Sequence, residues 1–485
     1  MSDEFEDVVA RVRERVTPDS EKRARLAAAV ETLRERTERA VADLPVADAS
    51  VVHVGSTARD TWLAGDRDID LFVRFPPDLS REDLERYGLE VGHAVLPEGR
   101  DEYAEHPYVH GEYDGFDVDL VPCYDVADAT AVQSAVDRTP FHTRYLADRI
   151  DDDLAGEVRA TKAFLTGVGV YGSDLRTRGF SGYLTELLVV EYGGVRAFVE
   201  AAADWHPPVV LDPADHAARS FEEPLVVVDP TDPERNVAAV CAPGSVARLQ
   251  HYARDLLADP RESLFVPDEP DPLSPAAVRE HVAARGTTPV AVRFDAPDVV
   301  DDQLYPQLEK SRAGLVDELD RRGFDVLRST AFADGTAVLF AELEVARRPA
   351  VERHEGPPVH VRDHAEGFYE TYDADDPDGG AGEGGAADES GDRDGDGEDG
   401  AGHEDGAGER VYGPFVDGER YVVERERAFA TAEGFLASDA LLNVALGARV
   451  EEALAADYEV LVGDEVATLA DAFGTELAAY FDPWP

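Results

Sequence analysis

The stretch GSTARDTWLAGDRDIDLFVRF, residues 55–75, decides how this sequence is interpreted. Asp68 and Asp70 stand two residues apart at the start of an apolar run, and alternate residues of a β-strand project to one face of its sheet. Two carboxylates on one face repel each other, so the pattern indicates a cation between or beside them. In a chain with 103 acidic residues, the pair taken alone also fits a solvated strand edge.

A third acid, Asp119, lies in a second apolar run, FDVDLVP (116–122). If the two strands are neighbours, three carboxylates converge. Such oxygen ligands suit Mg²⁺, which combines carboxylates with substrate phosphates. Two such ions can hold the attacking and the leaving oxygens of a phosphoryl or nucleotidyl transfer.

The residues upstream of this pair favour a phosphate-binding turn. Gly55 and Ser56 follow the apolar run SVVHV (50–54) and precede Arg59. A strand that passes through Gly-Ser into a helix start presents free N–H groups and a hydroxyl to a phosphate. Arg59, one turn further on, can add a bidentate contact. Gly-Ser-x-x-Arg followed by Asp-x-Asp is therefore more specific than either motif alone.

The charge of the chain is extreme. Its 485 residues carry 46 Lys and Arg against 103 Asp and Glu, a formal net charge of −57, and only three of the basic residues are lysines. This balance argues against a broad basic face for nucleic acid. An acidic, lysine-poor surface is also one solution to life in molar salt, where charges are screened within about 3 Å and local arginines still act at contact range. We favour this halophilic interpretation.

Other global features point to a cytoplasmic protein. Cys123 and Cys241 offer neither a disulfide framework nor a metal cluster, which fits a reducing compartment. The start MSDEFEDVVARVRERV is acidic and amphipathic, unlike a signal peptide. No run of 18 apolar residues occurs, so we expect no membrane association.

Hydrophobic periodicity divides the chain into an α+β, multidomain arrangement. Residues 1–140 form an α/β domain, residues 141–260 a mainly helical domain, 261–275 a linker rich in Pro and Asp, and 276–485 a C-terminal α/β region. Within the first domain we expect helices over 3–46, 80–97 and 126–136, and strands over 50–55, 69–75 and 116–122. Further predictions are strands at 224–230, 289–294 and 336–345, two strands within 411–429, and helices at 244–258 and 304–323.

Residues 373–409 interrupt the C-terminal region with an acidic insert that contains no Val, Ile, Leu or aromatic residue. Such a segment cannot bury enough surface to offset its ordering entropy, so we expect it to be disordered. Within it, DRDGDGEDG imitates the start of a calcium loop, but position 8 is Asp399 and position 12 is His403. We reject a calcium site there.

The order of these motifs resembles the nucleotidyltransferase superfamily that includes DNA polymerase β and poly(A) polymerases, and more closely the archaeal-type (class I) CCA-adding enzymes. The matching stretches cover most of residues 50–240. Besides 55–75 they are DLVPCY (119–124), RTPFHTRYL (138–146), RATKAFLTGVGVYGSDLRTRGFSGYLTELLV (159–189) and DPTDPERNVAA (229–239). The resemblance implies a polymerase-β-like head domain, a central nucleotide-binding domain and a C-terminal RNA-binding domain; the acidic insert at 373–409 is a departure from the family.

The resemblance also implies an activity: template-independent addition of C, C and A to the 3′ end of tRNA from CTP and ATP, with two Mg²⁺ ions and release of pyrophosphate. It implies a cytoplasmic enzyme and suggests a homodimer. Asp68, Asp70 and Asp119 would be the catalytic, Mg²⁺-holding residues. The implied nucleotide-binding residues are Ser56, Arg59, His142, Lys162, Tyr171 and Arg235.

Judged without the family, the last four of these nucleotide-binding residues are ambiguous. Lys162 could be a helix-surface lysine, His142 a loop histidine, Tyr171 a core residue, and Arg235 a capping or salt-bridge residue. Asp60 departs from the family, which usually has a small or uncharged residue there.

For tRNA we expect arginine contacts to the backbone beyond residue 280, because RNA helices are recognised mainly by shape. The candidates are Arg321, Arg322, Arg347, Arg348, Arg420 and Arg425, each of which could equally be a solvated arginine balancing acids. Two alternatives stay open: a nucleotidyltransferase acting on another acceptor, and a non-catalytic RNA-binding module on a degenerate transferase fold.

Overall fold

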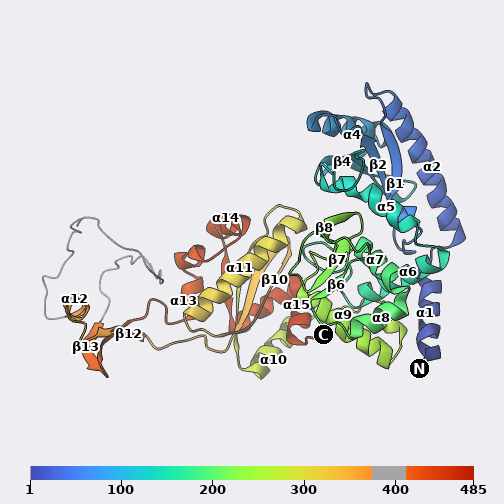
Figure 1. Cartoon of the computed structure of the whole chain (residues 1–485). Coiled ribbons are helices and arrows are strands. Elements are labelled where there is room, and N and C mark those ends of the chain that lie inside the picture. The colour runs from blue at the N-terminus through green and yellow to red at the C-terminus, as the bar shows by residue number, and fades with distance from the viewer. Residues whose placement is uncertain (1, 374–410) are drawn as a thin grey trace. The chain divides into compact units, whose positions relative to one another are not determined.

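The computed structural model describes residues 2–373 and 411–485. By contacts they form two compact units, residues 1–269 with Pro485, and residues 270–484. Figure 1 shows the elements of both, and each unit is described by itself. The predicted acidic insert and the rejected calcium loop lie outside the described residues, apart from Asp373. No helix in the described ranges is both long and apolar enough to cross a membrane.

The first unit begins with a five-stranded sheet in the order β1-β2-β5-β4-β3. Its strands are β1 Ser50–Val54, β2 Asp68–Phe75, β3 Arg100–Tyr103, β4 Pro107–Tyr113 and β5 Phe116–Tyr124. The helices that pack on it are α2 Ser20–Ala42 and α4 Arg81–Val95, which start at the N-caps Asp19 and Ser80. The short helix α3, Gly55–Ala58, follows β1 directly.

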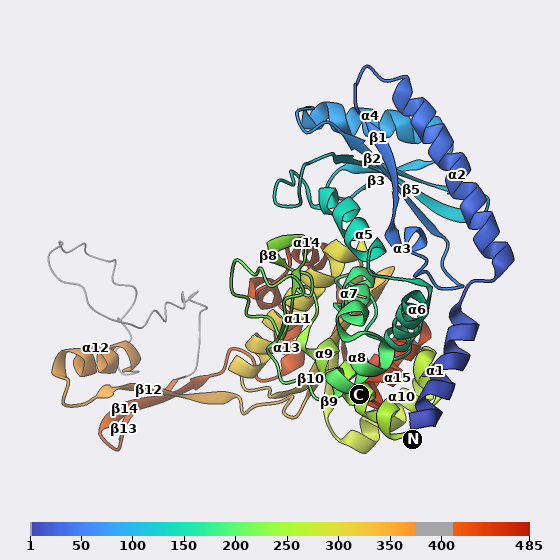
Figure 2. The ribbon, with the colours of Figure 1, turned by 45° about the vertical axis from the view of Figure 1, so that its right-hand side comes forward.

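Strand alternation gives this sheet two different faces. Ile69, Leu71 and Val73 of β2 are fully buried in the same apolar cluster as residues of α2 and α4. Asp68 and Asp70 alternate with these residues along the strand and therefore project from the opposite face of the sheet. Figure 2, turned from Figure 1, shows α2 and α4 along the sheet. The helices thus fix which face carries the acids.

The rest of the first unit is mainly helical. Its helices are α1 Ser2–Val16, α5 Thr139–Ala147, α6 Asp152–Gly167, α7 Gly182–Tyr192, α8 Val195–Ala203, α9 Pro243–Ala258 and the 3₁₀ turn η2 Glu262–Phe265. They share one apolar core with a small sheet in the order β6-β7-β8, namely Val209–Leu211, Leu225–Asp229 and Asp232–Asn236. Leu264 and Phe265, inside the predicted linker, are buried in this core.

The second unit contains two sheets. The first, in the order β10-β11-β9-β15, is formed by β9 Thr288–Asp295, β10 Val326–Asp334, β11 Thr336–Leu343 and β15 Glu459–Val462. Its two faces belong to separate apolar clusters. The helices of this unit are α10 Pro275–Arg285, α11 Asp301–Arg321, α13 Ala432–Leu436, α14 Ala448–Ala456 and α15 Ala470–Phe481, with 3₁₀ turns η3 Asp439–Asn443 and η4 Gly463–Leu469.

The second sheet of this unit has the order β12-β14-β13, with strands Val351–Pro358, Arg420–Glu426 and Val411–Asp417. Helix α12, Arg362–Tyr372, packs on all three strands.

The helix predicted over 126–136 is wrong. Only a 3₁₀ turn, η1 Ala135–Arg138, forms at its end. The buried carboxylate of Asp137 accepts hydrogen bonds from the backbone N–H groups of Tyr124, Gln133 and Ser134, all at 2.8 Å or less. A side chain that takes up three N–H groups competes with the helix for them, which favours a turn.

Candidate active site

The three predicted acids lie on adjacent strands. Strands β2 and β5 are parallel, and their register places Asp70 opposite Asp119, with Asp68 two residues earlier on the same face. Gly55 approaches them from the end of β1 with φ +78°, and a Cβ added there would lie 2.0 Å from Asp70 Oδ2. Only glycine fits this position, so the turn after β1 is held directly against the acids.

Mutual repulsion dominates the electrostatics of this group. Burial and the neighbouring carboxylates of Asp119 and Asp68 raise the pKa of Asp70 to about 7, with Arg59 acting in the opposite direction. Burial and nearby acids also raise the pKa of Asp68. Asp119 accepts a hydrogen bond from His110 Nδ1 at 2.8 Å, if that ring nitrogen carries the proton. A cation bound beside these three carboxylates would therefore relieve their mutual repulsion.

The donor chemistry fits a hard divalent cation, since the three side chains offer only carboxylate oxygens. Their atoms are nevertheless not drawn together into a ligand shell: within residues 2–373 and 411–485, no set of three His, Cys, Asp or Glu side chains is arranged to hold a metal ion. The strand register supports a metal-binding site at these acids, but their side chains are not arranged as metal ligands in this structure.

The predicted phosphate turn leads from these acids to the helical part of the unit. Ser56 lies in α3, one residue after Gly55, and is half-buried. The Arg59 side chain is only 7% exposed. Its Nε and Nη2 each lie 2.8 Å from Glu186 Oε2, and its Nη1 donates to Thr143 Oγ1 at 3.1 Å. Arg59 is thus held rigidly rather than extended into solvent.

Lys162 is buried, which excludes the helix-surface interpretation. Its Nζ donates to the backbone oxygen of Thr61 at 3.0 Å and lies 3.3 Å from Glu186 Oε1. Tyr171 lies in the same region: a Cβ added to Gly182 would meet Tyr171 Oη at 3.2 Å and Lys162 Nζ at 3.8 Å. Burial is the main cause of the raised pKa of Tyr171.

His142 and Arg235 meet at a common acid, Asp229 at the end of β7. His142 Nε2 and Arg235 Nη1 each lie 2.8 Å from Asp229 Oδ2. The His142 ring stacks on Tyr183 with ring centres 3.9 Å apart. Although burial opposes ionisation, the contact with His142 and the hydrogen bonds from Thr231 hold the pKa of Asp229 well below its usual range. The pKa of His142 is itself lowered, mainly by burial.

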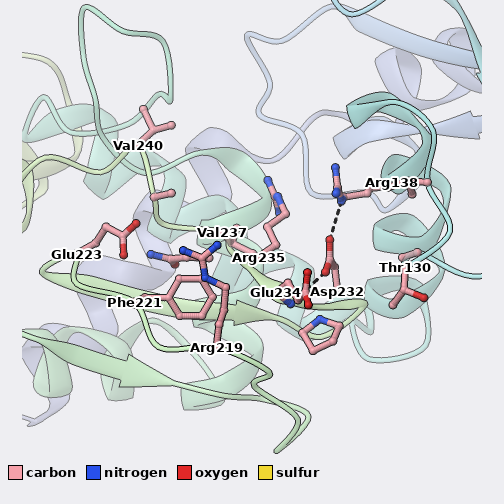
Figure 3. Close-up of a pocket in the computed structure, with 15 residues that line it drawn as sticks. Thr130, Arg138, Arg219, Phe221, Glu223, Asp232, Glu234, Arg235, Val237 and Val240 are labelled. Carbon is pink, nitrogen blue, oxygen red and sulfur yellow. Dashed lines mark hydrogen bonds and ion pairs between the residues drawn. The ribbon is translucent and has the colours of Figure 1, made fainter.

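A cavity of about 780 Å³ opens beside Arg235. Three guanidinium groups line it, together with an aromatic ring, three acids and several apolar residues: Arg138, Arg219, Arg235, Phe221, Glu223, Asp232 and Glu234 are among them. In Figure 3, Arg235 lies between Val237 and the ion pair of Arg138 with Asp232, which the structure gives as 3.0 Å. Its size suits a small organic ligand, and its three guanidinium groups are matched by three acids.

The nine predicted site residues therefore occupy connected places in one unit. The acids touch the turn that carries Ser56; Arg59 of that turn bonds to Thr143, the neighbour of His142. Lys162 lies beside Glu186, and both Lys162 and Tyr171 lie close to Gly182.

Sequence reasoning missed Glu186, Asp229 and Tyr183. Two of them carried a visible signal. Glu186 interrupts the apolar helix GYLTELLVV, and Asp229 ends the fully apolar run LVVV, so each is an acid where burial is expected. An acid in such a position needs a cation, which points to a site.

The six arginines predicted to contact tRNA come from three segments of the second unit. Several have protein partners: Arg322 lies 2.5 Å from Glu318 and over the ring of Phe435, and Arg425 lies 3.0 Å from Glu352. Arg420 donates to a backbone oxygen at 3.0 Å. Of the predicted arginines that form ion pairs, Arg321 has the most exposed side chain, at 70%.

The sheet, its face of three acids and the adjoining glycine turn define a nucleotidyltransferase, and the nucleotidyltransferase domain model matches residues 33–142. Residues 156–266 match the second domain of tRNA nucleotidyltransferases, and residues 285–378 with 402–463 match the C-terminal domain of CCA-adding enzymes. The chain belongs to the CCA-adding enzyme family and is a tRNA nucleotidyltransferase.

Its relatives extend over the whole length. The CCA-adding enzyme of Haloarcula marismortui is 60% identical over 100% of both chains, and that of Halobacterium salinarum is 59% identical over 98% of both. The CCA-adding enzyme of Methanoregula boonei is 42% identical over 84% of this chain and 83% of its own. The relatives from Haloarcula and Halobacterium agree with the halophilic interpretation of the charge.

Proposed function

We propose that this enzyme adds C, C and A to the 3′ end of tRNA from CTP and ATP, without a nucleic-acid template. The observation that carries the proposal is the register of Asp70 opposite Asp119, with Gly55 held against Asp70. This arrangement concentrates negative charge beside a turn suited to a triphosphate. The family supports tRNA as the acceptor.

In this mechanism Asp68, Asp70 and Asp119 would hold two Mg²⁺ ions. Such ions would lower the pKa of the tRNA 3′-hydroxyl and stabilise charge on the departing pyrophosphate. The 3′-oxygen forms a bond to the α-phosphorus, the bond from that phosphorus to the bridging oxygen of the β-phosphate breaks, and the hydroxyl proton is lost to solvent. No covalent enzyme intermediate is needed.

The chain's own residues bind and orient the nucleotide. Ser56 and Arg59 lie in the turn next to the acids and would contact its phosphates, and buried Lys162 contributes a fixed positive charge. His142, Tyr171 and Arg235 would surround the rest of the nucleotide. The cavity beside Arg235 offers room for a base or for the end of the acceptor strand.

We further propose that arginines of the second unit bind the tRNA backbone and that the enzyme is a cytoplasmic homodimer. The exposed guanidinium of Arg321 supports the first point. Light scattering of the full chain at high salt, with and without tRNA, tests the dimer, and a monomeric mass in both conditions would reject it.

The direct test of the function incubates the full chain with tRNA lacking CCA, Mg²⁺, CTP and ATP at high salt, and then sequences the 3′ ends. Ordered addition of C, C and A is expected. Extension of other RNA ends in preference to tRNA would instead favour a different acceptor. Binding of tRNA with no nucleotide incorporation would favour a non-catalytic RNA-binding module.

A further inference from the structure

Glu186 on α7 is one of the fully enclosed acids of the first unit, with a side chain that, like that of Asp229, is 0% exposed. Both of its oxygens are used. Oε2 lies 2.8 Å from Nε and Nη2 of Arg59, while Oε1 lies 3.3 Å from Lys162 Nζ and accepts a hydrogen bond from the Thr61 hydroxyl. Its partners therefore come from the turn after α3 and from α6.

We propose that Glu186 is a positioning residue for nucleotide binding: it holds Arg59 and Lys162 in the orientations in which they meet the triphosphate. This inference rests on the proposed function, which makes Arg59 and Lys162 nucleotide contacts. Glu186 itself is fully buried and acts through those two cations.

The geometry around Arg59 supports a fixed orientation. One oxygen of Glu186, Oε2, accepts from both Nε and Nη2 of the guanidinium, and Thr143 Oγ1 accepts from Nη1. A planar guanidinium held on two sides loses little further freedom when a phosphate replaces the weaker of those contacts. The neutral hydroxyl of Thr143 is the weaker partner, so Nη1 is the edge available for exchange.

Charge balance gives Glu186 its second role. Arg59 and Lys162 are 7% and 2% exposed, and two buried cations without an acid between them would repel. With Glu186 the cluster keeps one net positive charge, enough to attract a polyphosphate. The opposing effects of burial and of these cations leave the pKa of Glu186 below its usual value, so this carboxylate is ionised when the nucleotide arrives.

Glu186 also connects two parts of the first unit. Thr61 and Arg59 belong to the loop that leaves the sheet, whereas Lys162 and Glu186 belong to the helices. Lys162 bonds to the Thr61 backbone oxygen as well, which closes the cluster. The same contacts that aim the cations therefore fix the turn relative to α6 and α7.

The test is Glu186→Gln, a change of nearly equal shape that removes the charge. We measure ATP and CTP affinity without tRNA by calorimetry at constant high salt, and tRNA affinity separately. Losing one charged partner of a hydrogen-bonded cluster should weaken nucleotide binding about 10- to 100-fold, while tRNA affinity changes less than about threefold.

The matched control is Glu342→Gln in the second unit. Glu342 is equally buried and lies within 2.8 Å of Arg285 through both of its oxygens, with Thr287 and Tyr480 as further partners. Its loss should lower stability and leave nucleotide affinity unchanged. If the two variants lose stability alike and both keep normal nucleotide affinity, Glu186 has only a structural role and the proposal is overturned.

Thr61→Val keeps the test decisive if Glu186→Gln does not fold. It removes the hydroxyl that bonds to Glu186 and that also makes longer contacts, 3.4 Å to the Ser56 backbone oxygen and 3.5 Å to Lys162 Nζ. A smaller loss of nucleotide affinity, about two- to fivefold, is expected. Unchanged affinity in this variant would overturn the proposal. A wild-type chain that binds ATP but does not extend tRNA contradicts the proposed function alone, whereas one that binds neither nucleotide contradicts both.

Discussion

The first unit contains acids in two opposite electrostatic environments. Asp70 faces the carboxylates of Asp68 and Asp119, and its pKa rises to about 7. Glu186 faces the cations of Arg59 and Lys162, and its pKa falls although it is fully buried. The same chemical group is thus destabilised as an anion in one place and stabilised in the other.

The difference separates a site that needs an external cation from one completed by the protein. Repelling carboxylates on one face of a sheet are costly on their own, and a divalent ion relieves that cost. A carboxylate between an arginine and a lysine is already satisfied, so its removal leaves uncompensated cations. The predictions below depend on this contrast, from the largest expected effect to the smallest.

Asp70→Asn should abolish nucleotide incorporation, with a loss of about 10³-fold or more, because several kcal/mol of charge stabilisation disappear from the transition state. Turnover is measured with tRNA lacking CCA, and tRNA binding in parallel, which should stay within about threefold. The control is Asp117→Asn on the neighbouring strand β5, opposite Asp68 and exposed, which should keep most of the activity. Turnover near the wild-type rate in Asp70→Asn would remove the acids from the mechanism.

Stability should change in opposite directions in the two groups. At pH 8 without divalent metal, Asp70→Asn should stabilise the chain by about 1–3 kcal/mol, since an acid with a raised pKa loses stability as pH rises through that pKa. Glu186→Gln should destabilise it by about 3–5 kcal/mol.

Chemical denaturation at pH 8 and at pH 5 measures both changes. At pH 5 Asp70 is protonated in the folded chain but still largely ionised in the unfolded one, so the gain from Asp70→Asn should be smaller than at pH 8 and should vanish only near pH 4. The loss from Glu186→Gln should persist at both values, because a lowered pKa keeps Glu186 ionised throughout. Equal signs for the two variants at pH 8 would break the comparison.

Metal affinity should depend on pH through Asp70. A divalent ion binds the ionised carboxylate, so below pH 7 the apparent affinity should fall by about tenfold for each pH unit. Titration with Mn²⁺ as a paramagnetic probe between pH 5.5 and 8.5 measures this slope. Asp70→Asn should bind weakly at every pH and show a smaller slope; an equally steep slope in that variant would assign the proton to another group.

Much of the first unit could be predicted because its signals are local. The strands at 50–55, 69–75 and 116–122 and the helices of 3–46 and 80–97 follow from apolar periodicity, and the structure confirms them within a few residues. The alternation Asp68, Ile69, Asp70 fixes which side chains share a face. The pairing of β2 with β5 joins residues far apart in the sequence. From the sequence it could be stated only as a condition: if the two strands are neighbours, the three carboxylates converge.

The features that could not be predicted from the sequence depend on partners that are distant along the chain. Strands β3 and β4 were missed because runs such as RDEY and PYVHGEY have little apolar alternation and form strands by pairing with their neighbours, β3 with β4 and β4 with β5. Glu186 was passed over because its cations lie 127 and 24 residues away. Periodicity reports the environment of a residue, whereas an ion-pair cluster is assembled only by the fold.

The smallest effect concerns exposed arginines. The Arg321 side chain is 70% exposed, and its partner Glu318, which is 13% exposed, also lies 2.5 Å from Arg322. Because Glu318 keeps Arg322 as a partner, Arg321 can turn to a phosphate at little cost, unlike Arg59, whose own side chain is only 7% exposed. Arg321→Ala should weaken tRNA binding only a few-fold, and should reduce the slope of log affinity against log salt by about 0.9 if one phosphate contact is lost.

Arg425→Ala serves as the comparison for Arg321, because its side chain is only 22% exposed and is paired with Glu352. We expect that change to alter stability more than the salt slope. Affinities are measured over a range of high salt concentrations, where long-range attraction is screened and only contacts remain. An unchanged slope in Arg321→Ala would show that exposure of the guanidinium alone does not select the arginines that meet RNA.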